Sequence, residues 1–213
     1  MPKVVDHARR RDEIALVACQ AIARRGFAQA TMAHIAQAAG YTTGMIAHYF
    51  DSKQQIILAA LRLILRRIEL RLTQRAGADA PDLLGVLCEA LPIDAQRRTE
   101  CAFWIAFWGQ LPADPELKRL NAWVHREYRR LFERCLREHW PESAHWPARL
   151  RADVSRSIIT FVNGITASAV SSPRDWPASE QVCQLRMHLA RLRLWTQNSA
   201  GTAATEKRAW TLR

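Results

Sequence analysis

The stretch Thr31-Met-Ala-His-Ile-Ala-Gln-Ala-Ala-Gly-Tyr-Thr-Thr-Gly-Met-Ile-Ala-His-Tyr-Phe-Asp-Ser-Lys53 decides the fold of this 213-residue chain. Thr31 is a suitable N-cap for a first helix, because its hydroxyl can accept a hydrogen bond from an unpaired backbone N–H. Gly40 stands where that helix must end, since glycine adopts the left-handed conformation of a helix C-terminus without a steric penalty. Thr42 can cap a second short helix two residues later. Two short helices joined by a tight turn that contains glycine predict a helix-turn-helix.

The second short helix is expected to have one buried and one exposed face. Ile46 and Phe50 are four residues apart and point inward together. The opposite face, which could enter the major groove of DNA, carries Thr43, Gly44, Ala47 and His48. Helices this short bury little surface by themselves. They must therefore pack on the amphipathic helix that the apolar spacing predicts from about Arg9 to Arg25.

Positive charge is concentrated around this segment. The chain has 31 Lys+Arg and 20 Asp+Glu, a formal net charge of +11. Residues 1–75 carry 12 Lys+Arg and 5 Asp+Glu, so their net charge is +7. This excess favours an anionic partner, either nucleic acid or a membrane surface. The cluster Arg9-Arg10-Arg11 fits a DNA-contacting arm and a solvated charge cluster at a helix start equally well.

The rest of the chain is predicted to be helical as well. Apolar residues recur at helical spacing, and no segment shows the alternation of a strand. Ser52 and Gln55 form a capping box that would open a long helix reaching about Gln74. We therefore expect an all-α fold, in which an N-terminal three-helix helix-turn-helix domain is joined by this long helix to a C-terminal helical bundle. The predicted parts are residues 1–52 for the helix-turn-helix, 53–197 for the bundle and 198–213 as a flexible tail.

From about Arg10 to Leu65 the chain resembles the DNA-binding domain of the TetR family of transcriptional repressors. The matching positions, in order and spacing, are Thr31, Ile35-Ala36, Ala39-Gly40, Gly44, Tyr49-Phe50 and Lys53. The resemblance implies DNA binding by residues 1–52, with residues 42–49 as the recognition helix, and ligand binding and dimerisation by residues 53–197. By family position, the residues that would approach bases are Thr43, Gly44 and His48, and those that would hold phosphates are Thr31, Thr42, Tyr49 and Lys53. The chain departs from the family at Tyr41-Thr42, often Val-Ser, and at Ala47, often an aromatic residue.

The middle of the chain is rich in tryptophan. Trp104, Phe107 and Trp108 share one face of a predicted helix, and Trp123 and Tyr128 follow in the next helix. Residues 101–136 resemble, more loosely, the C-terminal domain of the choline-responsive BetI-type repressors, which implies an effector site. Aromatic faces bind a quaternary ammonium by cation–π attraction. The same cavity would also suit an apolar or aromatic effector, and aromatic residues at this spacing also occur as ordinary core.

The resemblance to repressors further implies a two-fold dimer. One recognition helix reads only a few base pairs, whereas a dimer places two of them one DNA turn apart on a palindromic operator. We expect the last two long helices, about Ala148–Ser171 and Ala178–Trp195, to form a four-helix bundle with their twins. The predicted interface residues are Phe161, Gly164, Ile165, Ser168, Leu185, Leu189 and Leu192. The alternative is that these side chains face the chain's own core.

Other classes of protein are disfavoured. No P-loop, nucleophile-elbow or zinc-protease motif is present, so we expect no enzyme, no catalytic residue, no metal and no cofactor. The five cysteines are scattered and odd in number, which fits reduced thiols in the cytoplasm. The uncharged run Ser157–Pro173 is shorter than the ~20 apolar residues of a membrane span, and the start lacks a secretory signal.

The sequence therefore predicts a cytoplasmic, ligand-released repressor. It would bind double-stranded DNA as a homodimer, respond to a small-molecule effector and not enter a membrane. The alternative is a basic helical module that binds membrane surfaces or other proteins without reading a DNA sequence.

Overall fold

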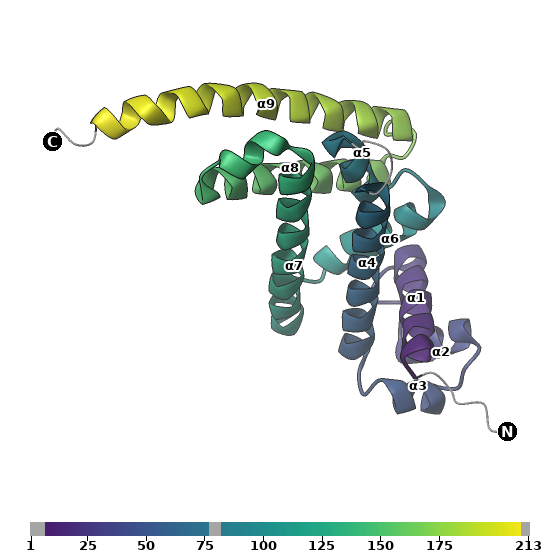
Figure 1. The fold of residues 1–213 in the computed structure, drawn as a ribbon. Helices are drawn as coiled ribbons and strands as arrows, with labels where there is room; N and C mark the ends of the chain where they lie inside the picture. Colours follow the sequence, from purple (N-terminus) through teal and green to yellow (C-terminus); the bar gives the residue numbers. More distant parts are fainter. Residues whose placement is uncertain (1–6, 77–81, 210–213) are drawn as a thin grey trace.

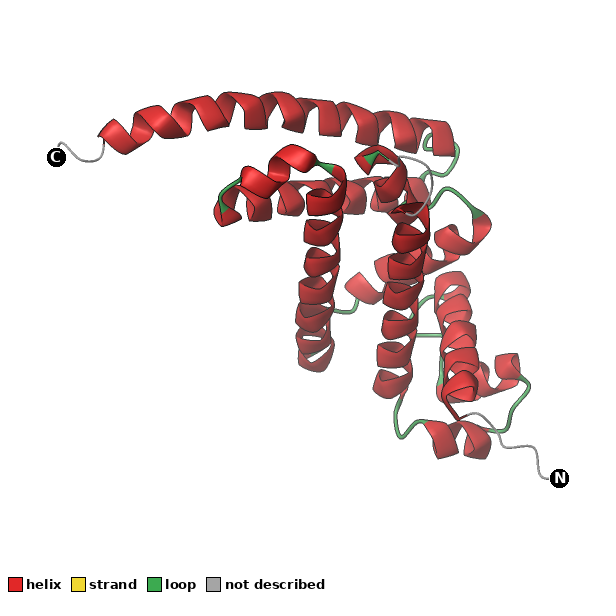
Figure 2. Cartoon of the chain, viewed as in Figure 1, coloured by secondary structure: helices red, strands yellow, loops and turns green. Residues whose placement is uncertain are grey.

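The computed structural model describes residues 7–76 and 82–209, with residues 198–209 described as backbone only. All regular elements in these ranges are helices, which confirms the predicted all-α fold (Figure 1, Figure 2). The α-helices are α1 (His7–Arg25), α2 (Met32–Ala39), α3 (Thr43–Tyr49), α4 (Lys53–Ala76), α5 (Leu83–Leu87), α6 (Ala95–Trp108), α7 (Pro115–His139), α8 (Ala148–Ser171) and α9 (Ala178–Ala209). Two short 3₁₀ helices are η1 (Cys88–Ala90) and η2 (Pro141–His145).

The caps of the helix-turn-helix are those that the sequence predicts. The Thr31 hydroxyl accepts a hydrogen bond from the His34 N–H at 3.2 Å, and the Thr42 hydroxyl accepts one from the Met45 N–H at 3.1 Å. Gly40 has a φ of 71° and closes the C-terminus of α2 through its backbone N–H. These local contacts fix a tight turn between α2 and α3.

The connecting helix α4 begins at the predicted capping box. The Ser52 hydroxyl accepts a hydrogen bond from the Gln55 N–H at 3.3 Å. The Gln55 side chain in turn bonds Asp51, accepting from its N–H and donating to its carboxylate. Because the cap fixes where α4 starts, it also fixes the exit direction of the chain from the helix-turn-helix. Residues 77–81, which follow this helix, lie outside the described residues.

Helix α1 belongs to two hydrophobic cores at once. Ile14 and Ala18 pack in the small core of the helix-turn-helix. Their neighbours Ala15 and Cys19 pack in the large core of the C-terminal bundle. The start of α4 also reaches back, since Ile56 lies in the small core. The boundary predicted between residues 52 and 53 therefore falls between two helices. It does not divide the chain into two parts with separate cores, because α1 and α4 contribute to both.

The two ends of the molecule are far apart along α4. Figure 1 shows α2 and α3 at one end of the long helices, and α8 and α9 running together across the other end. Among the helices of residues 7–76 and 82–209, none combines the length and the apolar composition of a membrane-spanning segment.

Helix α9 continues to Ala209, so most of the segment predicted as a flexible tail is helical in the structure. Residues 198–209 contain no proline and several alanines. Extending an existing helix needs no new nucleus, so such a segment continues the helix even without an apolar stripe. The last predicted tail residues, 210–213, lie outside the described residues.

The turn at Gly40 yields a prediction about stability. A Cβ built at this position would meet no heavy atom within 4 Å, so its backbone conformation is the sole strain. Gly40→Ala should lower the free energy of unfolding by about 1–2 kcal/mol, as measured by urea denaturation. Gly40→Asn should lose less, because asparagine tolerates the left-handed region better. Equal losses in the two variants would contradict this account.

Candidate functional sites

Helix α3 presents the exposed face that the sequence predicts. Ile46 and Phe50 are buried in the small core. The residues left open to solvent on the other side are Thr43, Gly44, Ala47 and His48. Thr31 and Thr42 are exposed as well, at the starts of α2 and α3. This face has small side chains and one imidazole, and it lies at the end of the molecule opposite α8 and α9 (Figure 1).

Two of the predicted phosphate-contacting residues are engaged within the protein. Tyr49 is only 7% exposed, and its ring packs 5.0 Å from that of His7, so little of it is accessible to a phosphate. Lys53 Nζ donates to the Phe27 carbonyl at 2.6 Å and lies 4.4 Å from the centre of the Phe27 ring. Burial lowers the pKa of Lys53. A lysine ammonium has three N–H donors, so Lys53 can still bind a phosphate while it anchors the loop after α1.

Arg10 ties α1 to the turn of the helix-turn-helix. Its guanidinium donates to the Tyr41 hydroxyl and to the Glu13 carboxylate at 3.0 Å. The Tyr41 hydroxyl also donates to Glu13, at 3.5 Å. Tyr41 is one of the positions where the chain departs from the family pattern, and the departure has a structural role in this chain.

Arg11 makes a second tie, to the end of α3. Its guanidinium donates to the Tyr49 carbonyl and lies 4.2 Å from the centre of the Phe50 ring. Arg10 and Arg11 therefore link α1 to the turn and to the end of α3, so neither is a fully solvated charge. The DNA-contacting arm stays a prediction.

A small cavity lies among α4, α6, α7 and α8. Its walls are formed by Ile68, Arg71, Ala90, Arg97, Glu100, Cys101, Trp104, Trp108, Val124, His125, Tyr128, Asn163 and Thr166. It leaves about 30 Å³ for the centres of water-sized molecules, which is room for a few waters at most. A larger ligand must therefore push its walls apart.

The cavity brings together only two of the four predicted ligand residues. Trp104 and Trp108 line it, but Phe107 and Trp123 do not. Phe107 is fully buried in the large core, because its side chain points from the flank of α6 that packs on the bundle. Trp123 faces away from the cavity, with the Arg62 guanidinium 5.5 Å from its ring centre. The helical spacing identified α6 and α7 as helices that line the cavity, but it did not show which face of each helix points into it.

Most of the polar lining of the cavity was not predicted from the sequence. The side chains of Tyr128, His125 and Asn163 line the cavity and make no hydrogen bond to another residue of the described ranges, so they can bond a ligand. Burial raises the pKa of the Tyr128 hydroxyl, which stays protonated. Burial lowers the pKa of His125, and the nearby Arg129 lowers it further, which favours neutral imidazole. Burial raises the pKa of Cys101 to about 12, so its thiol is a poor nucleophile.

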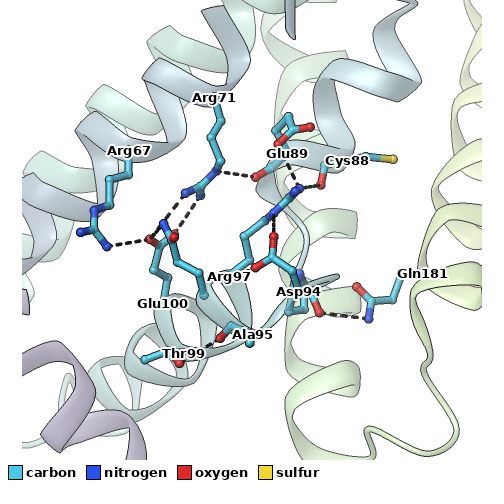
Figure 3. A network of polar contacts seen from close by, with 12 residues as sticks. Arg67, Arg71, Cys88, Glu89, Asp94, Ala95, Arg97, Thr99, Glu100 and Gln181 are labelled. Atoms are coloured by element: carbon cyan, nitrogen blue, oxygen red, sulfur yellow. Dashed lines mark hydrogen bonds and ion pairs between the residues drawn. The ribbon is translucent and has the colours of Figure 1, made fainter. Parts of the chain in front are cut away.

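Charged side chains close the cavity on the side of α4. Glu100 is 3% exposed and meets Arg71 at 2.8 Å and Arg67 at 3.4 Å (Figure 3). Arg97 in turn pairs with Glu89 at 3.0 Å and with Asp94 at 2.6 Å. The carboxylates in this network are thus already balanced by guanidinium groups.

The predicted dimer face is only partly exposed. Ile165, Leu185 and Leu192 are buried in the large core of the same chain, so for them the alternative considered from the sequence is correct. The other predicted residues are half-buried or exposed: Phe161, Gly164, Ser168 and Leu189. The ring of Phe161 stacks on that of His188, with centroids 4.0 Å apart.

Helix α9 also has apolar side chains on its solvent-facing side, opposite the side that Leu185 and Leu192 bury in the core. Met187 is 42% exposed and Leu194 is 63% exposed. Cys183 and Ala190 are exposed too, so the four residues form a stripe at helical spacing. An apolar stripe turned away from its own core is typical of a surface that another helix covers.

Comparisons with known proteins agree on both parts of the chain. Residues 14–60 match the model of the tetR family of bacterial regulatory proteins, and residues 79–194 match that of the BetI-type transcriptional repressor C-terminal domain. The HTH-type transcriptional regulator BetI of Stenotrophomonas maltophilia (strain R551-3) is 32% identical over 169 residues, which cover 78% of this chain and 83% of that protein.

Solved structures share the fold at lower identity. A transcriptional regulator from Rhodococcus sp. Rha1 has a TM-score of 0.72 and 21% identity, covering 85% of this chain and 95% of that one. A regulator from Saccharomonospora viridis, solved in complex with choline, has a TM-score of 0.69 and 19% identity, covering 85% of this chain and 96% of that one.

The tie between α1 and the turn can be tested by a double-mutant cycle. Tyr41→Phe removes the hydroxyl that Arg10 bonds, and Arg10→Gln removes the guanidinium. Each variant should lower the unfolding free energy, and the loss in the double variant should be smaller than the sum of the two losses, because both remove the same contact. Chemical denaturation measures this, and strictly additive losses would show that the contact contributes nothing.

Proposed function

The chain belongs to the TetR family of transcriptional regulators, and we propose that it is a repressor that reads a palindromic operator as a dimer and releases it on binding an organic cation. The observation that carries the DNA-binding part is the exposed face of α3, supported by family matches over both parts of the chain. These comparisons lend no support to a module that acts only on membrane surfaces or proteins.

The exposed face of α3 fits the major groove. Thr43, Gly44 and His48 would approach base edges, and the small side chains of Gly44 and Ala47 allow the helix backbone to come close. Thr31 and Thr42 lie at helix starts, where hydroxyl and backbone N–H groups suit phosphate oxygens.

Lys53 and His48 should differ in their effects on binding. Lys53→Ala removes a charge, so it should weaken binding to all DNA sequences alike and reduce the slope of log affinity against log salt by about one. His48→Ala should instead relax discrimination at one base pair of each half-site. Fluorescence anisotropy with operator variants over a salt series separates the two. An unchanged salt slope in Lys53→Ala would exclude a phosphate contact for this residue.

We place the dimer interface on the outward faces of α8 and α9. Gly164 and Ser168 leave room for close helix packing, and Met187 and Leu194 supply apolar surface that the monomer leaves exposed. Pairing these faces about a two-fold axis would form a four-helix bundle far from both α3 helices. The dimer would then hold two reading helices one DNA turn apart, about 34–36 Å.

Charges placed on this stripe should disrupt the dimer. Met187→Glu combined with Leu194→Glu should give monomers in analytical ultracentrifugation and weaken operator binding, because burying four carboxylates in the paired faces is unfavourable. Leu70→Glu is the matched control, since Leu70 is 56% exposed on α4 and lies outside this face. A double variant that remains dimeric would place the interface elsewhere.

The cavity chemistry favours an organic cation as effector. Trp104, Trp108 and Tyr128 offer aromatic faces, and Glu100 supplies a carboxylate at the same wall. The choline complex of the Saccharomonospora viridis relative supports this class of ligand. An apolar or aromatic effector is the second candidate. Arg67 and Arg71 already neutralise the charge of Glu100, so the cavity does not require a cationic ligand.

Choline and its uncharged isostere 3,3-dimethylbutanol distinguish the two candidates. Choline should weaken operator binding, and the isostere, which has the same shape without the charge, should not. Trp104→Leu should reduce the response to choline, whereas Trp123→Leu should keep it, because Trp123 lies outside the cavity. Equal responses to both compounds in operator-shift assays would favour the apolar candidate.

A further inference from the structure

Glu100 is a buried carboxylate shared by two arginines of one helix. Its Oε2 accepts a hydrogen bond from Arg71 Nη2 at 2.8 Å, and its Oε1 accepts from Arg67 Nη1 at 3.4 Å (Figure 3). Gln96 Nε2 donates to Oε1 as well, at 3.2 Å. A carboxylate this buried is stable in its charged form only with such partners. A further cation placed beside Glu100 would therefore weaken its ion pairs with Arg67 and Arg71.

The same carboxylate belongs to the wall of the cavity. Glu100, Trp104 and Trp108 are spaced four residues apart and lie on one face of α6. A cation held against the two indole rings is thus beside the carboxylate that binds Arg67 and Arg71. Arg71 also lines the cavity, while Arg67 does not.

Glu100 also joins elements that lead to the reading helix. Arg67 and Arg71 lie on α4, whose first turns pack in the small core through Ile56. Helix α6 packs closely on α1 and α8, and Phe103 of α6 shares the large core with Cys19 of α1. The start of α6 is fixed separately, because Arg97 bonds Asp94, Glu89 and the Cys88 carbonyl.

We propose that Glu100 couples the cavity to the DNA-binding end, because a bound organic cation competes with Arg67 and Arg71 for its carboxylate. This inference rests on the proposed function, since it assumes an operator and a cationic effector. Loss of the ion pairs frees α4 to move relative to α6. Glu100 is thus a positioning residue that converts the charge of a ligand into a change in the contact between two helices.

The charges set the direction of this effect. Arg67, Arg71 and Glu100 carry a net charge of +1, so a further cation beside Glu100 repels both guanidinium groups. Arg67 has the longer of the two contacts, and its side chain is the more exposed, so it can turn to solvent first. A neutral ligand of the same size would leave the ion pairs in place.

Two substitutions should change cation binding in opposite directions. Glu100→Gln keeps the size of the side chain but removes its charge, so it should weaken choline binding in isothermal titration calorimetry. Arg67→Gln removes a competitor, so it should strengthen choline binding. A merely structural role would change both affinities in the same direction, through loss of folding, and that result would overturn the inference.

Coupling is measured as the ratio of operator affinities without and with saturating choline. We expect about fivefold or more for the wild type and a ratio near one for Glu100→Gln. Without choline, Glu100→Gln should bind the operator more weakly than the wild type, because it already lacks the ion pairs that hold α4 against α6. Glu69→Gln is the matched control. It removes another ion pair of α4, with Arg134 at 2.8 Å, but lies outside the cavity, so it should keep the wild-type ratio.

The outcomes distinguish this inference from the proposed function. A wild-type ratio retained in Glu100→Gln would overturn the coupling role alone, and a ratio equally lost in Glu69→Gln would do the same. A wild type that binds the operator but ignores choline and tetramethylammonium would overturn both the cationic effector and the coupling. A wild type that selects no DNA sequence from a random pool would refute the repressor itself.

Discussion

The structure depends on the packing of α1 between two cores. Ile14 and Ala18 face the helix-turn-helix, and Ala15 and Cys19 face the bundle. A helix is stiff over this length and its interior contacts are close-packed, so a shift imposed on one face reaches the other face. The DNA-binding end therefore moves together with α1, and any signal from the cavity has to act on α1 or on the parallel link through α4.

Local signals in the sequence were sufficient for the helix-turn-helix. Thr31, Gly40 and Thr42 form their caps through atoms only a few residues away, so the chain needs no distant partner to specify them. Ile46 was also predictable as buried. A helix as short as α3 is not stable alone, so its apolar face must pack on the neighbouring helices. By contrast, the contact of Arg10 with Tyr41 joins residues 31 positions apart and has no local pattern.

Periodicity could not decide which partner covers an apolar stripe. Leu185 and Leu192 have the spacing expected of a dimer helix, yet they fill the core of their own chain. A subunit interface and a monomer core use the same apolar chemistry, and only the rotation of α9 distinguishes them. For the same reason Trp104 lines the cavity whereas Phe107, three residues later, does not. The polar lining comes from helices distant in sequence, and no single segment could reveal it.

The charged cluster beside the cavity is costly as a purely structural feature. Well-packed apolar side chains in place of a buried ion pair are often as stabilising or more so, and the large core of this chain has many such residues. An apolar contact between α4 and α6 would, however, be indifferent to the charge of a ligand. Glu100 and its two arginines make that contact depend on local charge, and the narrow cavity requires its walls to move when a ligand enters. A ligand shifts a conformational equilibrium only by its differential affinity for the two states, and this arrangement supplies that difference where the two helices meet.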